Sequence, residues 1–154
     1  MRVEIATLAK NASVDRGGKV NLRGAGAAVV MTSDFPIPIE LDLVLRIVPS
    51  LPEAVSTTQG EVYLVSSDGE RISTKCFELA SISDSEVEEV AGIAHSIAHL
   101  AKSSIVSLRD FEIPQDGDYH IEVLLNGVTI IQLPLCAIDE RETGGSSIPG
   151  TKWM

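Results

Sequence analysis

Alternation of apolar and polar residues is the main signal along this chain, and it is clearest over 39–48. The residues on one side of an extended chain here are aliphatic: Ile39, Leu41, Leu43, Leu45 and Ile47. Those on the other side include three charged residues: Glu40, Asp42 and Arg46. A period of two residues predicts a β-strand with one buried face and one face in water.

Pairs of turn residues divide the other alternating segments into hairpins. The pairs are Gly17-Gly18, Asp68-Gly69 and Asn126-Gly127. Each tolerates the positive φ angles that tight hairpin turns require. The strands expected on either side of these turns are an N-terminal segment and residues 19–31, 61–66, 71–79, 118–125 and 128–138.

The hairpin at Asn126-Gly127 also predicts a β-bulge, near Ile130-Ile131. An uninterrupted register would set Gln132 against Ile121 and Pro134 against Tyr119, which breaks the apolar face. One extra residue restores the apolar pairs. These pairs are then Ile121 with Leu133 and Tyr119 with Leu135.

One helix is predicted between the strands, over about 84–102. Ser83 and Glu86 fit a capping box, in which each side chain satisfies a free backbone N–H at the helix start. Apolar residues at helical spacing form one stripe, which is rich in alanine and includes Ile97. Because alanine is small, the helix can lie close to a sheet, and Ile97 is expected to be buried there. A further strand is expected over 104–111.

The elements total about eight strands and one helix, without regular alternation of strand and helix. This arrangement favours an all-β fold, an antiparallel β-sandwich of immunoglobulin-like or jelly-roll-like type with one inserted α-helix, over residues 1–138. Residues 139–154 become polar and rich in Gly and Ser, which predicts a flexible C-terminal tail.

Composition narrows the classes of partner. The 154 residues carry 12 Lys and Arg against 22 Asp and Glu, a formal charge of -10. Such an acidic chain repels nucleic acid and favours a basic partner. No apolar run is long enough to cross a membrane, and no signal-peptide core follows Met1, so a cytoplasmic protein is expected. Cys76 and Cys136 are expected to be free thiols, with a disulfide between them as the alternative.

Two sets of residues carry weak metal-binding signals. His95 and His99 lie one helical turn apart, but Ser96 stands where a zinc protease has glutamate, and a third ligand is missing. Asp116 and Asp118 could bind calcium, although Asp-Gly-Asp is also ordinary turn sequence. No Gly-x-Ser-x-Gly elbow and no cysteine nucleophile motif are present. We therefore expect no metal and no cofactor.

Several hairpin and strand-entry motifs together resemble a known family. They are Gly18-Lys19-Val20-Asn21-Leu22, Phe35-Pro36, Ile113-Pro114, Gly117-Asp118-Tyr119 and Asn126-Gly127. In these the chain resembles an uncharacterised family of bacterial β-sandwich proteins, a domain of unknown function, over most of its length up to about Ile138. The helix at 84–102 is like an insertion relative to that pattern. The resemblance implies the fold and a bacterial origin, and it supplies no catalytic residues.

Two functional hypotheses follow. The first is a non-enzymatic binding or assembly module that contacts a protein partner, or a second copy of itself, through a sheet edge and the C-terminal tail. Ile148 and Trp153 are the apolar residues of that tail that could enter a partner's groove, unless Trp153 folds back on its own domain. The alternative is a small metal-dependent enzyme that uses His95 and His99.

Overall fold

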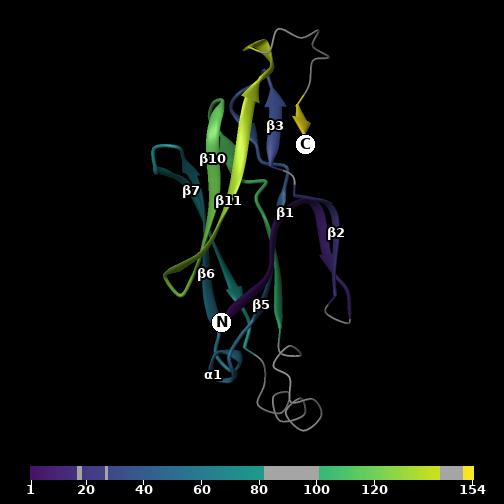
Figure 1. Cartoon of the computed structure of the whole chain (residues 1–154), viewed down its shortest axis with the longest axis vertical. Helices are drawn as coiled ribbons and strands as arrows, with labels where there is room; N and C mark the ends of the chain where they lie inside the picture. Colours follow the sequence, from purple (N-terminus) through teal and green to yellow (C-terminus); the bar gives the residue numbers. More distant parts are fainter. Residues whose placement is uncertain (17–18, 27, 82–100, 143–150) are drawn as a thin grey trace.

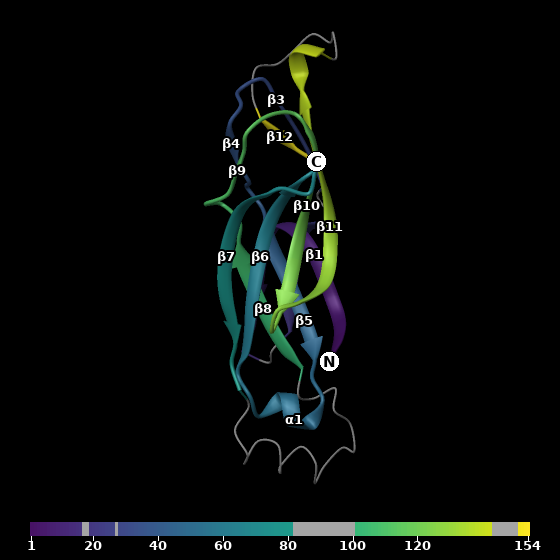
Figure 2. The ribbon, with the colours of Figure 1, turned by 90° about the vertical axis from the view of Figure 1, so that its left-hand side faces the viewer.

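The computed structural model describes residues 1–16, 19–26, 28–81, 101–142 and 151–154. These residues form two facing β-sheets, as the sequence predicted (Figures 1 and 2). Figure 2 shows β7, β6, β10 and β11 side by side, with β8, β5 and β1 behind them. The predicted helix at 84–102 lies almost entirely outside the described residues, and Lys102, its last residue, instead begins a strand.

Sheet order places strands from distant parts of the sequence together. The first sheet has four strands in the order β2-β1-β5-β8: β1 (Arg2–Val14), β2 (Val20–Ala25), β5 (Asp42–Val48) and β8 (Lys102–Ser107). The second has six in the order β12-β3-β11-β10-β6-β7: β3 (Val29–Thr32), β6 (Thr58–Ser66), β7 (Arg71–Leu79), β10 (Gly117–Leu125), β11 (Val128–Asp139) and β12 (Lys152–Trp153).

Shorter elements close the ends of the sandwich. A two-stranded sheet pairs β4 (Ile37–Pro38) with β9 (Glu112–Ile113). A short helix, α1 (Leu51–Ala54), follows β5, and a 3-10 turn, η2 (Glu140–Glu142), follows β11. No helix in the described part of the chain is long and apolar enough to cross a membrane.

The two sheets enclose an aliphatic core. Its fully buried side chains include Leu43, Leu45, Leu64, Val62, Ile121, Val123 and Leu135. The predicted buried face of 39–48 is confirmed, because all five of its aliphatic residues are inaccessible to water. The opposite face was expected to be exposed to solvent, but it is only partly so: Val44 is 0% exposed and Asp42 is 7% exposed. Asp42 is buried because the guanidinium of Arg109 pairs with its carboxylate, a contact that strand periodicity cannot predict.

The strands of the three predicted hairpins pair as expected, although residues 17–18 of the first turn lie outside the described part of the chain, and the last hairpin has the predicted bulge. Asn126 and Gly127 have φ angles of 49° and 79°, as a tight turn between twisted strands requires. The register shifts between Val123 and Leu124, leaving Ile130 without a partner in β10. The pairs Ile121–Leu133 and Tyr119–Leu135 then form as predicted.

Other strands differ from the prediction. Residues 19–31 do not form one strand: they divide into β2 and β3, which belong to different sheets. The expected strand at 104–111 ends at Ser107. β3 pairs with β11 in parallel, whereas every other described pair is antiparallel. That parallel pairing begins at Cys136, so β11 has an open side at Pro134, as expected of a residue with no N–H to donate.

Candidate functional site

The distal part of the β1–β2 hairpin projects from the four-stranded sheet at one side of the molecule (Figure 1). β1 pairs with β5 only as far as Ala9, and from there to Val14 it pairs with β2 alone. Five of the six residues of β2 are exposed. The distal half of the hairpin is therefore a two-stranded ribbon with exposed residues on both faces, and neither of its edges pairs with another described strand.

The two faces of this ribbon differ in chemistry. Val14 lies opposite Val20 and Ala12 opposite Leu22, so these four aliphatic residues share one face. Val14 is 42% exposed and Leu22 is 39% exposed, which leaves an uncovered apolar strip. The other face carries polar residues and one cation: Asn11, Ser13, Asn21 and Arg23.

Cations gather on the ribbon and at its base. We call six exposed residues the basic edge: Lys10, Arg16, Lys19, Arg23, Arg109 and Lys152. They are half of the chain's 12 Lys and Arg. Acidic residues also lie in this part of the molecule, among them Asp15, Glu40 and Asp42. Only Arg109 among the six forms an ion pair within the described residues. The basic edge is thus a local excess of positive charge on an acidic protein.

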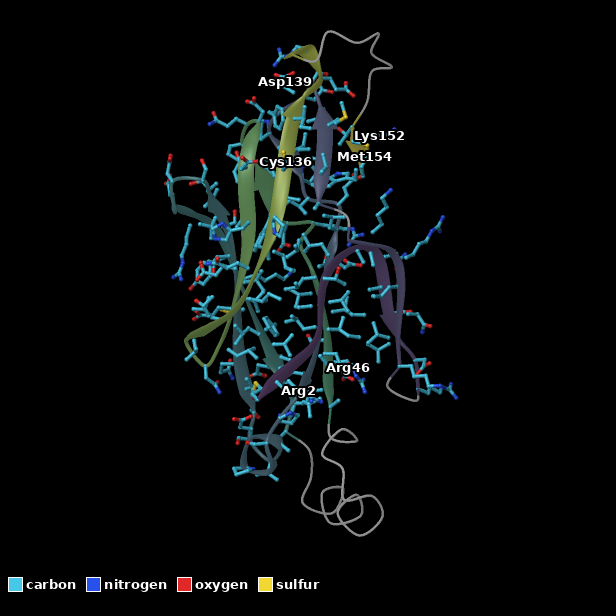
Figure 3. The ribbon with its side chains drawn as sticks, in the orientation of Figure 1. Arg2, Arg46, Cys136, Asp139, Lys152 and Met154 are labelled. Carbon is cyan, nitrogen blue, oxygen red and sulfur yellow. The ribbon has the colours of Figure 1, made fainter. Side chains whose placement is uncertain are left out.

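A depression of about 640 Å³ opens at the base of the hairpin. Its lining comes from four separate parts of the sequence and includes Lys10, Pro38, Glu40, Arg109, Lys152 and Trp153. Figure 3 shows Lys152 near the bend where β1 turns toward β2, while Arg2 and Arg46 lie toward the other end of the sandwich. Lys10 belongs to both the hairpin and the depression and so makes them one continuous surface.

Local contacts hold the cations of the depression in place. The Arg109 guanidinium donates to the Asp42 carboxylate and, through Nη2, to the Lys10 carbonyl oxygen at 3.2 Å. Gly24 has a φ of +64°, and a Cβ there would lie 2.9 Å from the Lys10 Cγ and Cδ. Glycine at this position therefore allows the Lys10 side chain to lie across β2, and a larger residue would displace it.

Strand β12 forms one wall of the depression, and its pairing with β3 explains why the Trp153 side chain is buried. Met154 exchanges two hydrogen bonds with Val29, at 2.7 and 3.1 Å, and the Thr151 and Thr32 hydroxyls are 3.1 Å apart. Trp153 is 7% exposed and belongs to the main core. Residues 152–153 thus belong to the sandwich and not to a free tail, and the Trp153 ring packs in its own domain instead of being available to a partner.

A second polar cluster lies on the outer face of the six-stranded sheet, where its groups satisfy one another. The Glu122 carboxylate accepts hydrogen bonds from Arg71 at 2.9 Å and Thr129 at 3.0 Å. Burial acts to raise the pKa of Glu122, but these two hydrogen bonds together with the nearby positive charge outweigh it and hold the pKa below its usual value. The Arg71 guanidinium also lies 4.0 Å from the centre of the Tyr63 ring. With its charges paired, this cluster stabilises the sheet and leaves little charge for a ligand.

The predicted site residues have different outcomes. His95, His99 and Ile148 lie outside the described residues. Within the described part of the chain, no group of three or more His, Cys, Asp and Glu could hold a metal ion. Cys76 and Cys136 are free thiols, as expected.

The basic edge itself was missed by sequence reasoning. Lys10, Arg109 and Lys152 are far apart in the sequence, so no motif connects them. Arg16, Lys19 and Arg23 surround the predicted Gly17-Gly18 turn, and this local excess of cations on an acidic chain was the available signal.

Comparison with known proteins identifies a family but no activity. No curated protein matches this sequence. A structure of Pseudomonas fluorescens alkylpurine DNA glycosylase AlkC, bound to DNA containing an abasic site analog, aligns with a TM-score of 0.35 and 14% sequence identity. The alignment covers 86% of this chain and 30% of the enzyme chain.

The family match covers most of the chain. The model of a family of unknown function, DUF6941, matches residues 4–138, which run from β1 to near the end of β11. The resemblance of the turn and strand-entry motifs to an uncharacterised domain family is therefore confirmed, and this chain belongs to the family of unknown function DUF6941.

Proposed function

We propose that this protein is a non-enzymatic binding module that holds an acidic segment of a partner protein along the basic edge. The observation that carries the proposal is the set of exposed cations without ion-pair partners among the described residues, Lys10, Arg16, Lys19, Arg23 and Lys152, on a chain of net charge -10. Like charges that lie near one another repel. A ligand that brings carboxylates relieves that repulsion.

The chemistry of the edge favours a protein segment over nucleic acid. A nucleic acid carries charge along its whole length and would meet the acidic remainder of the surface. A short acidic segment needs only the basic edge. The exposed apolar strip beside it, which includes Val14 and Leu22, also suits a polypeptide better than a phosphate backbone.

The residues of the basic edge suit binding better than catalysis. They are Lys and Arg side chains, and the exposed aliphatic residues Val14 and Leu22 lie beside them. Such a set can attract an acidic ligand and bury part of it, which is the chemistry of a binding surface.

The test compares charge reversals on and off the basic edge. The probe is a fluorescein-labelled oligoglutamate peptide, followed by anisotropy at low salt. Reversal of Lys10 and Lys152 together, Lys10→Glu and Lys152→Glu, is expected to weaken binding at least about tenfold, or about 1.4 kcal/mol. Arg2→Glu is the control, because Arg2 is exposed and lies toward the far end of the sandwich (Figure 3).

Three results would overturn the proposal. They are no binding of the acidic peptide, equal loss in the Arg2→Glu control, and equally tight binding of a single-stranded oligonucleotide of the same charge. The first would exclude an acidic ligand and the second would indicate a non-specific charge effect. The third would make nucleic acid the better partner.

A further inference from the structure

Strand β2 is the most open of the four edge strands in the two larger sheets. On the opposite side of the sandwich, the edge strands β7 and β8 are bridged by Lys75, whose Nζ donates to the Ser107 carbonyl oxygen at 2.9 Å. The edge strand β12 has two residues. β2 has six, and nothing in the described part of the chain pairs with its outer side.

The ladder between β1 and β2 fixes which backbone groups of β2 are free. The Asp15 N–H donates to the Lys19 carbonyl oxygen at 2.9 Å, so this pair is hydrogen-bonded. Hydrogen-bonded and non-hydrogen-bonded pairs alternate in an antiparallel ladder. The next pair, Val14–Val20, and the pair Ala12–Leu22 are therefore non-hydrogen-bonded. Val20 and Leu22 consequently direct their N–H and C=O groups outward, where an added strand could bind them.

A strand added there would have a different environment on each face. Side chains on its first face would continue the apolar strip formed by Val20 and Leu22. Side chains on its second face would lie beside Asn21 and Arg23. The chemistry of β2 thus selects a sequence in which apolar residues alternate with acidic residues.

We infer that the partner segment binds by adding a strand to the outer edge of β2, and that apolar and acidic residues alternate along it. The inference rests on the proposed function, because it specifies how the acidic segment is held. A second copy of this hairpin fits less well: edge-to-edge pairing of two copies would bring their Arg16, Lys19 and Arg23 residues together. An acidic segment instead complements them.

The experiment uses the full chain and two peptides of identical composition. One alternates valine and glutamate, and the other has all valines in one block and all glutamates in another. The alternating peptide is expected to bind at least about tenfold more tightly. Leu22→Thr keeps a strand-forming residue but shortens the apolar strip, so it should weaken only the alternating peptide, several-fold.

Backbone methylation then tests the ladder directly. N-methylation of one alternate set of residues in the peptide should abolish binding, and methylation of the other set should have little effect. Loss from methylated valines would indicate an antiparallel added strand, and loss from methylated glutamates would indicate a parallel one. Equal effects of the two sets would overturn strand addition.

The outcomes separate this inference from the proposed function. If both peptides bind equally and Arg23→Glu weakens both, the basic edge binds acidic segments but not as a strand. If neither peptide binds, both conclusions fail. If the alternating peptide binds wild type and Arg23→Glu equally, the charge of the edge is irrelevant and the proposed function fails.

Discussion

Replacement of Trp153 by alanine tests whether strand β12 is an integral part of the core. A buried Trp removes about 150–250 Å² from water, which at about 25 cal/mol/Å² corresponds to roughly 4–6 kcal/mol. The Trp153 Nε1 atom is buried without a hydrogen-bond partner among the described residues, which offsets about 1–3 kcal/mol of that gain. Trp153→Ala should therefore destabilise the fold by about 3 kcal/mol.

Replacement of Trp153 by phenylalanine separates the stability contributed by the aromatic ring from the cost of the buried indole N–H. Trp153→Phe keeps an aromatic ring and removes the unpartnered donor, so the loss of contact area and the relief of the buried N–H largely cancel. We expect its stability within about 1 kcal/mol of wild type. Met154→Ala is the matched control, because Met154 is adjacent and 45% exposed, and it should change stability by less than about 0.5 kcal/mol.

The assay is equilibrium urea unfolding followed by far-UV circular dichroism, which does not depend on the single Trp of the chain. The midpoint should fall for Trp153→Ala with little change in the slope of the transition. A Trp153→Ala midpoint equal to that of Met154→Ala would refute the reasoning. The ring would then be outside the core, and a role as a partner anchor would again be open.

Three further predictions concern the scaffold. Gly60→Ala should cost about 1–3 kcal/mol in urea unfolding, because a Cβ at Gly60 would overlap the Phe77 ring, and the cost should shrink in a Phe77→Leu background. Stability should fall as the pH drops below about 4.5, because the pKa of Glu122 is lower in the folded chain, and the fall should be smaller in Glu122→Gln. Asn126→Ala should lower the stability by about 1–2 kcal/mol in thermal unfolding. The substitution removes the side-chain oxygen that accepts a hydrogen bond from the Gln59 N–H, and it places alanine at a φ of 49°, where its backbone is strained. An unchanged midpoint would contradict the turn assignment.

The elements that were predictable from sequence depend on local rules. Asn-Gly fixes a two-residue turn, and the turn fixes the register of the strands on either side of it. The bulge beside Ile130 followed because any other register would have broken the apolar face of β10. The alternation over 39–48 likewise located the strand that supplies Leu43 and Leu45 to the core. In each case the determining residues lie within one hairpin or one strand.

The features that were not predictable depend on contacts between distant residues. Strand β12 is two residues long and exists because Val29 and Val30 lie beside it. Residues 19–31 divide between two sheets at Gly24 and Gly26, both with positive φ, and the alternation alone gave no sign of this break. Asp42 occupies a position that the strand pattern assigns to solvent, yet its carboxylate is buried and pairs with the half-exposed guanidinium of Arg109. The candidate site needs all of these contacts, so the sequence alone could not predict it.

The cations of β2 have a simpler explanation that must be weighed against partner binding. Edge strands often carry Lys or Arg because charge discourages pairing with another chain, and Arg23 and Lys19 fit that protective role. A purely protective edge, however, gains nothing from exposed aliphatic residues beside its free backbone groups. Val14 and Leu22 are 42% and 39% exposed there, which favours association with any strand of suitable charge. The cations of the basic edge repel a second copy of the same edge, whereas the apolar strip favours contact with a strand. Together these two effects select an acidic partner and disfavour self-association.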